Sequence, residues 1–250
     1  MFVLQGVELR QSLMEWQDEG LVIGARKHGE TSVILELMTR AHGRHLGVVR
    51  GGRSKTLRPV LQPGNLVAAS WRARLEDHLG AFSVEPVSWR AARYLDRAAA
   101  LHGVALLSAL LRLLPERDPQ PELFHTANAI AARLDAMDAA GPLLARFELA
   151  LLAALGFGLD LSCCALTGTR DDLAFVSPKS GRAVARCAGA PWSARLLPFP
   201  EFLREASDEA SQTEIADAFR LTGYFLTRDV LAPRGVSMPA ARALYLEALG

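Results

Sequence analysis

The sequence predicts an α+β protein, in which an N-terminal five-stranded β-barrel precedes a mainly α-helical domain with a small irregular insert. Three observations predict this fold class. Apolar residues follow strand-like, short-range spacing over 19–85, helical spacing begins at residue 88, and residues 160–200 are rich in Gly, Pro and Ser. At 250 residues, of which 50% are hydrophobic, the chain is long enough for two or three compact units.

Five short apolar segments separated by turn-like breaks predict the strands of the barrel. In the second of them, Val33, Leu35 and Leu37 are expected to point inward, because strand side chains alternate between two faces. Pro86 closes this region, so a barrel domain is expected over 14–86. The segments are LVIGA, SVILELM, RHLGVV, LVAASWR and LGAFSVE.

The helical domain is expected over 87–250, with the irregular insert at about 160–200. Met14 opens a plausible second start, which makes residues 1–13 a possible extension. One predicted helix, which begins near Pro142, is apolar on most sides and is expected at the centre of the helical core. The helices are predicted after Ser88 and over Glu122–Met137, Pro142–Leu155, Thr213–Leu231 and Pro239–Leu249.

A local excess of positive charge is the main functional signal. The chain has a net charge of only +1, yet no acidic residue lies between Glu36 and Glu76. Such a one-sided basic stretch is typical of a surface that meets nucleic-acid phosphates, although acidic residues elsewhere in the fold can also neutralise it. The candidate DNA-binding residues are Arg40, Arg44, Arg50, Arg53, Lys55, Arg58, Arg72 and Arg74.

Within this stretch, residues 50–58 form a glycine-containing loop with four cations. The loop lacks the spacing of a nucleotide-binding P-loop, and we expect it to lie along a nucleic-acid backbone, the alternative being an ordinary hairpin tip. Trp71 alternates in phase with small and apolar residues of its strand, which predicts a core position. The stretch has no other aromatic residue apart from histidine, so binding is expected to be led by the backbone and independent of sequence.

No metal or cofactor site is expected. His42 and His45 lack neighbouring carboxylate ligands, and Cys163, Cys164 and Cys187 lack the paired spacing of structural zinc sites. Three cysteines, two of them adjacent, also favour a reducing cytoplasm without disulfides.

The sequence favours a binding protein over an enzyme. No common nucleophile, metalloprotease or nucleotide-hydrolase motif is present, and the acidic pair Asp171 and Asp172 stands alone. The turn at 177–182 is open to two interpretations, an anion-accepting turn or a surface hairpin. The longest uncharged stretch, Ala98–Leu111, is too short to cross a bilayer, so no membrane partner is expected.

Several segments together resemble the RecO family of bacterial DNA repair proteins. The likeness covers nearly the whole chain from Met14 onward, and it depends on the order and spacing of the segments. They are GLVIGARKHGETSVILELMTRAHGRHLGVVRGGRS, FELALLAALGFGLDLSCCALTG, VSPKSGRAV, LLPFPEFL and LTGYFLTRDVLAPRG.

The resemblance implies an N-terminal OB-fold, a helical C-terminal domain and a non-enzymatic recombination mediator in the nucleoid-associated cytoplasm. Members of this family bind single- and double-stranded DNA, anneal complementary strands, associate with RecR and help to load RecA onto DNA coated by single-strand-binding protein. Some carry a four-cysteine zinc site in a zinc-ribbon-like insert, of which this chain keeps only Cys164 and Cys187.

The family also docks the acidic, Phe-ending tail of single-strand-binding protein on its helical domain. That mode needs an apolar pocket beside a basic residue, and Arg133 and Arg146 lie on predicted helices. Two other functions stay open from the residues alone. An RNA-binding OB-fold module shares the same electrostatics, and a metal-dependent nuclease needs only carboxylates that converge in space.

Overall fold

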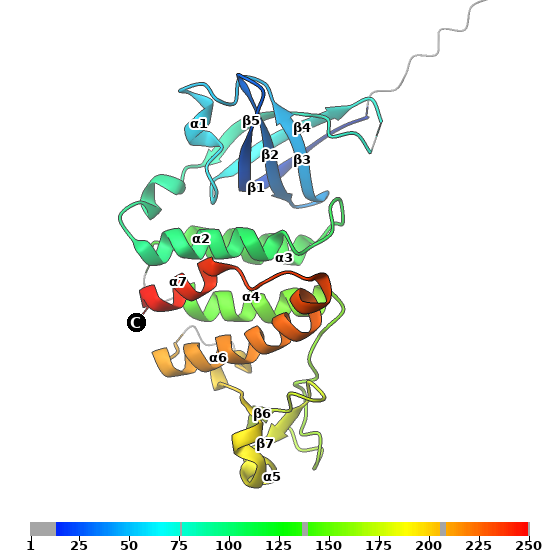
Figure 1. Ribbon diagram of the computed structural model, residues 1–250, viewed down its shortest axis with the longest axis vertical. Helices are drawn as coiled ribbons and strands as arrows, with labels where there is room; N and C mark the ends of the chain where they lie inside the picture. The colour runs from blue at the N-terminus through cyan, green and yellow to red at the C-terminus, as the bar shows by residue number, and fades with distance from the viewer. Residues whose placement is uncertain (1–13, 76, 137–139, 206–208, 250) are drawn as a thin grey trace, which may run out of the picture.

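The computed structural model describes residues 14–75, 77–136, 140–205 and 209–249, and the possible extension at 1–13 lies outside these residues. A β-barrel lies at one end of the molecule, helices form the middle, and a small sheet lies at the other end (Figure 1). The predicted α+β class, with a barrel followed by helices and an insert, is confirmed.

Five strands close into a barrel in the order β1-β2-β3-β5-β4. All neighbouring strands pair antiparallel except β3 and β5, which run parallel where Val48 pairs with Ala81. A five-stranded barrel of this kind is an OB-fold, as expected. The strands are β1 Met14–His28, β2 Ser32–Thr39, β3 Gly43–Val49, β4 Leu66–Ala73 and β5 Ala81–Ser88, and the short helix α1 Leu57–Val60 lies between β3 and β4.

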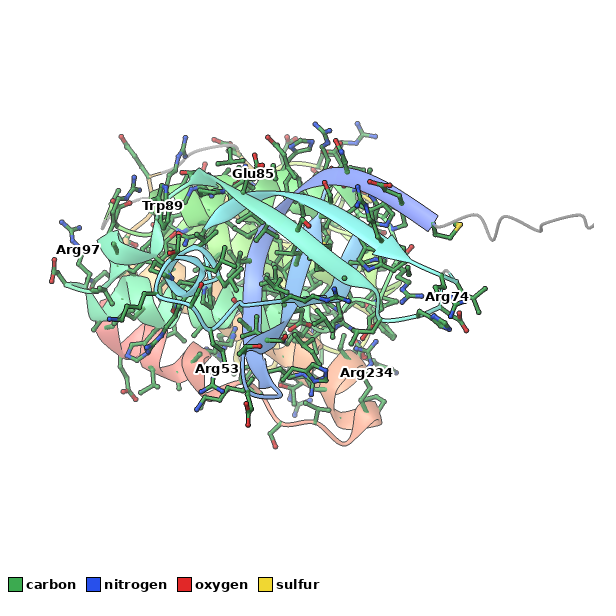
Figure 2. All side chains as sticks on the ribbon, turned by 90° about the horizontal axis from the view of Figure 1, so that it is seen from above. Arg53, Arg74, Glu85, Trp89, Arg97 and Arg234 are labelled. Atoms are coloured by element: carbon green, nitrogen blue, oxygen red, sulfur yellow. The ribbon has the colours of Figure 1, made fainter. Side chains whose placement is uncertain are left out.

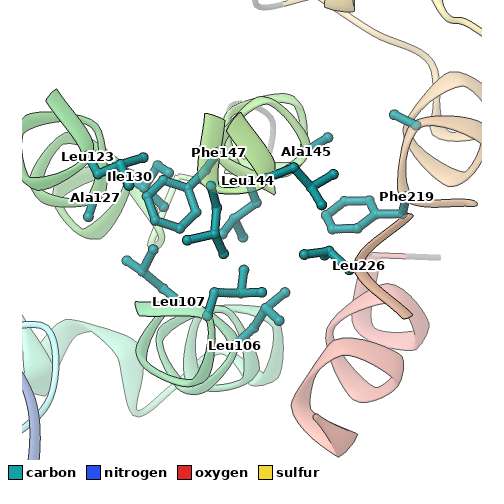
Figure 3. Close-up of a cluster of buried hydrophobic side chains, with 14 of the residues drawn as sticks. Leu106, Leu107, Leu123, Ala127, Ile130, Leu144, Ala145, Phe147, Phe219 and Leu226 are labelled. Carbon is teal, nitrogen blue, oxygen red and sulfur yellow. The ribbon is translucent and has the colours of Figure 1, made fainter. Parts of the chain in front are cut away.

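Helix α4 lies at the centre of the helical layers, which confirms the prediction from its apolar sequence. Its Leu144 and Phe147 pack with Leu107 of α2, Ile130 of α3 and Phe219 of α6 in one buried cluster (Figure 3). Burial of a Leu or Phe side chain contributes about 1.5–3 kcal/mol, so this cluster is a main source of stability. The helices are α2 Ala98–Leu111, α3 Pro121–Arg133, α4 Ala140–Ala154, α6 Gln212–Phe225 and α7 Ala240–Leu249.

The barrel and the helices share part of one hydrophobic core. Val33, Leu35 and Leu37 of β2 point into the barrel, as predicted. Met38 of the same strand faces the other way and is fully buried in the cluster that contains the helices. Helices α2 and α3 contact β1, and α3 also contacts β2. Alternate side chains of β2 therefore enter two different apolar environments, the inside of the barrel and the helical core. In an isolated barrel, one of these two faces would be exposed to water.

Two helix boundaries differ from the prediction. Helix α3 ends at Arg133, and the rest of the predicted segment, to Met137, reaches beyond the described residues. The predicted helix over Thr213–Leu231 is α-helical only to Phe225, and a π-helical turn, η4, covers Leu226–Leu231. The π-helical turn buries Leu226, Val230 and Leu231, so the apolar pattern continues through it and does not reveal the wider turn.

The insert is built on a small antiparallel sheet in the order β7-β6-β8. Strands β6 Leu173–Val176 and β7 Ala183–Ala185 correspond to the predicted pieces LAFVS and GRAVARC, and β8 is Leu197–Pro198. Helix α5 Arg186–Gly189 and the 3-10 turn η2 Ala190–Arg195 complete it. Its inner residues join the same core as the helices, so packing secures the insert.

A buried ion pair secures α7 against α4 and α6. Nε of Arg242 lies 2.8 Å from Oε1 of Glu148, and Nη2 lies 3.0 Å from Oε2, in bidentate geometry. Thr222 donates to the same carboxylate, and Glu148 is fully buried. Gly223 makes room for the guanidinium, because a Cβ at that position would lie 2.8 Å from Nη2 of Arg242.

Candidate nucleic-acid interface

The eight candidate cations lie at different places on the barrel. Arg74 lies at one end of the barrel. Arg53 lies far from Arg74, on the side of the molecule where Trp89 and Arg97 lie (Figure 2). The continuous basic stretch of the sequence is thus divided between separate regions of the surface.

Two of the exposed cations have carboxylate partners that the sequence pattern could not indicate. Nε of Arg40 lies 3.7 Å from Oδ1 of Asp18, and Nη2 of Arg72 lies 2.7 Å from Oε1 of Glu15. Both acidic residues belong to β1, which lies outside the basic stretch. The Arg72–Glu15 pair is exposed and contributes only about 0–1 kcal/mol, whereas the Asp18 carboxylate opposite the exposed Arg40 is buried. Both pairs weaken the local positive field.

Arg44 lies at the contact between the barrel and the helices, and its side chain is only 15% exposed. Its Nη1 lies 2.8 Å from Oε1 of Glu36, its Nη2 lies 3.5 Å from Oε1 of Glu116, and its Nε donates to the carbonyl oxygen of Leu114. Arg112 of α2 approaches the same Glu36 carboxylate, with its Nε 2.6 Å from Oε2. The charge of Arg44 is therefore neutralised inside the fold.

The basic loop, residues 50–58, holds the cations that are open to solvent. Arg50, Lys55 and Arg58 are exposed, and none of them has a side-chain partner among the described residues. Arg53 is exposed as well, but its Nη1 donates to the carbonyl oxygens of Gly29 and Glu30 in the turn between β1 and β2. Arg53 thus ties the basic loop to that turn.

A groove of about 570 Å³ runs beside the basic loop. Three cations of the loop form one wall, and Trp89 and Leu95, which are 54% and 69% exposed, form part of the opposite, more apolar wall. Arg53 and Arg58 also line a second hollow of about 330 Å³ together with Lys27. The two arginines therefore line both concave surfaces, each of which has three cations in its lining.

Trp89 is the residue of this site that the sequence pattern did not indicate. It lies after the basic stretch, just beyond β5, in the segment that separates the two hydrophobic patterns. Only the close approach of residues 89–95 to the basic loop places an aromatic ring beside the cations. Trp71, in contrast, is 1% exposed, which confirms its predicted core position.

His42 and His45 lie at another part of the barrel and have different surroundings. The ring of His42 stacks on Trp16 with centroids 4.1 Å apart, and its Nδ1 lies 3.2 Å from Oδ2 of Asp18. His45 is buried edge-on against Trp16 and Trp71, and within the described part of the chain neither of its ring nitrogens has a hydrogen-bond partner. Burial, and after it the positive charge of Arg117, lowers the pKa of His45 to about 4.

This shift predicts that acid destabilises the protein through His45. The unfolded chain takes up a proton near pH 6.5 and the folded chain only near pH 4, so stability present above pH 6.5 is lost as the pH falls to 4. The loss is about 3 kcal/mol in the free energy of unfolding. Urea unfolding between pH 7 and 4 should show a shallower pH dependence for His45→Phe than for the unchanged protein. Equal slopes for both would contradict the assignment.

The three cysteines of the insert do not converge. Cys164 is buried, Cys163 is half-buried and Cys187 is exposed. Burial disfavours the Cys164 thiolate, but hydrogen bonds outweigh it, among them one from the backbone N–H of Ala185 over 3.2 Å, and lower the pKa of this thiol to about 7. Within the described part of the chain, no three His, Cys, Asp or Glu side chains gather where they could hold a metal ion. No helix of that part is long and apolar enough to cross a membrane.

Comparison with known proteins gives matches over nearly the whole chain. Residues 14–89 match the family described as Recombination protein O N terminal, and residues 94–237 match Recombination protein O C terminal. The DNA repair protein RecO of Chelativorans sp. is 61% identical over 238 residues, which cover 94% of this chain and 96% of that protein. The DNA repair protein RecO of Mesorhizobium japonicum is 59% identical, and the match covers 94% of this chain and 94% of that protein. The RecO protein of Rhizobium etli is 57% identical, and the match covers 94% of this chain and 92% of that protein.

Proposed function

This chain belongs to the RecO family of DNA repair proteins, and from that premise we propose that it is a non-enzymatic recombination mediator. In this role it binds single- and double-stranded DNA and anneals complementary strands. It also helps to load RecA onto DNA coated by single-strand-binding protein. These substrates imply a cytoplasmic location at the nucleoid.

One observation carries the proposed DNA binding. The basic loop presents Arg50, Lys55 and Arg58 to solvent without carboxylate partners among the described residues, beside an open groove. Unpaired surface cations attract phosphates because their binding releases the counterions that surround the nucleic acid. Arg53 adds a fourth positive charge at the same place, while Arg40, Arg72 and Arg74 are proposed as outlying contacts. Arg44 is excluded from this set by its position inside the fold.

This arrangement supports annealing without nucleotide hydrolysis. Two DNA strands repel each other through their phosphates, and a surface with several unpaired cations reduces that repulsion where the strands meet. Contacts to the phosphates leave the base edges free for pairing. Base pairing then supplies the free energy of the reaction, so neither ATP nor a metal ion is needed.

Partner binding is proposed for the helical region. An apolar cavity of about 230 Å³ is lined by Leu134, Tyr245 and Arg97, and Nη1 of Arg97 also donates to the carbonyl oxygen of Asp135. An acidic, Phe-ending tail of single-strand-binding protein fits such a site, because the ring needs an apolar pocket and the carboxylates need a cation. Arg146, a residue expected from the sequence, instead donates to the carbonyl oxygen of Phe202. RecR is the other proposed partner.

The two alternative functions have less support. An RNA-binding module uses the same cations, and comparison of matched DNA and RNA single strands separates it through the 2′-hydroxyl groups. A nuclease would cleave DNA when magnesium is added, and no specific observation favours it.

Strand annealing tests the proposal directly. We expect the protein to accelerate pairing of two complementary labelled oligonucleotides coated with the cognate single-strand-binding protein, without ATP or metal. The acceleration should fade between 50 and 200 mM salt, because the cations act through phosphates. Fluorescence energy transfer between the labels follows the reaction, and heat-denatured protein is the control. Absence of acceleration at both salt concentrations, with the fold intact, would contradict the annealing role.

A further inference from the structure

Trp89 is held in place although its side chain is open to solvent. The indole is 54% exposed, and it has no hydrogen bond or ring contact among the described residues. Its backbone is fixed on both sides, since Ser88 pairs with Leu66 of the neighbouring strand β4 and the N–H of Arg90 donates to Oδ1 of Asn65 over 2.8 Å. An aromatic ring that a fixed backbone presents to solvent can contact a ligand with little further loss of conformational freedom.

Asn65 connects Trp89 to the basic loop. This residue is 2% exposed, and its Nδ2 donates to the carbonyl oxygens of Pro59 and Val60, 2.8 and 3.1 Å away, which lie in α1 directly after the basic loop. Its Oδ1 accepts from the N–H groups of Arg90 and of the following residue. One buried amide thus sets the position of the tryptophan relative to the cations, so that the two walls of the groove are pre-organised.

The chemistry of the two walls matches a single nucleotide of an unpaired strand. Lys55 and Arg58 provide positive charge that suits phosphates, while Trp89 and Leu95 offer apolar surface that suits a base. A flat aromatic ring stacks with any of the four bases, because each base has a π-face. A duplex cannot use this wall, since its bases are already stacked on one another.

We propose that Trp89 stacks on an unpaired base of single-stranded DNA while the basic loop holds the adjacent phosphates. The inference rests on the proposed DNA binding. It adds a contact with a base to the contacts that the basic loop makes with the DNA backbone. It gives the protein a preference for single strands without sequence specificity.

Three variants at two tryptophans test the stacking. Trp192 lies in the insert, is also 54% exposed, and serves as the matched control. Affinities are measured for an oligothymidylate of 20 nucleotides and for an abasic strand of the same length, which keeps the phosphates and lacks the bases. We expect Trp89→Ala to bind oligothymidylate about tenfold more weakly and the abasic strand as before. Trp192→Ala should bind both as before, and Trp89→Phe should recover most of the affinity.

The outcomes separate this inference from the proposed function. Trp89→Ala and the unchanged protein could bind oligothymidylate equally well and with the same sensitivity to salt. That result overturns the stacking and leaves the DNA-binding proposal intact. An equal loss for both strands also overturns it, because the indole would then act without a base. If the unchanged protein binds neither strand, both proposals fail. If an acidic peptide ending in Phe binds in a Trp89-dependent way while DNA binding is unaffected, the groove is a peptide site and the inference is wrong.

Discussion

Charge reversal at Lys55 and Arg58 should weaken binding of a single-stranded oligonucleotide by about a hundredfold at 50 mM salt, because two phosphate contacts are lost and two repulsive charges are added. Both side chains are exposed, line the groove and have no partner among the described residues. The affinity of this variant should also depend less steeply on the salt concentration. A surface that neutralises about five phosphates loses about a hundredfold in affinity from 50 to 200 mM salt, whereas three contacts lose about twentyfold. Fluorescence anisotropy at several salt concentrations measures both quantities.

The matched control is a reversal of two exposed arginines far from the barrel. Arg195 of η2 and Arg220 of α6 are exposed and have no partner among the described residues, and their replacement by glutamate changes the net charge by the same amount. We expect this control to keep most of the affinity and the salt slope. If both double variants weaken binding equally, net charge alone explains the effect, and the basic loop is not the site.

The sequence predicted the barrel and the central helix because both depend on patterns that the chain carries locally. Alternation along β2 and β4 identified the buried faces, and the apolar sequence of α4 identified the middle of the core. The shared core of barrel and helices was not predictable in the same way. Met38 shows why, since its spacing in the strand indicates an outer face, and only the tertiary contact with the helices buries it.

The candidate site was predicted in part for a similar reason. The cations of the basic loop lie close together in the sequence, so a local count of charges identified them. The partners of Arg40 and Arg72 come from β1, and Trp89 enters the groove from beyond β5. Each of these contacts joins residues that are far apart in the chain. Charge patterning therefore located the surface, while the fold determined which cations are open and which side chain faces them.

Removal of the buried guanidinium should have the largest effect on stability. Arg242→Ala is expected to lower the free energy of unfolding by about 3–5 kcal/mol, because the fully buried Glu148 carboxylate loses its charged partner. Thr222 alone cannot compensate for a buried negative charge. The contact of α7 with α2 should loosen with it, since Arg242 is the residue that joins α7 to this carboxylate of α4. Urea unfolding followed by circular dichroism gives the free energy.

A paired replacement distinguishes the cost of an unpaired charge from a need for the ion pair itself. In Glu148→Leu/Arg242→Met both charges are replaced by apolar side chains, and we expect most of the lost stability to return. If the double variant is as unstable as Arg242→Ala, packing around the guanidinium is the cause instead, including the space that Gly223 leaves for it. The DNA affinity of the folded double variant should equal that of the unchanged protein, because the ion pair lies in the helical core, away from the basic loop that the phosphates meet.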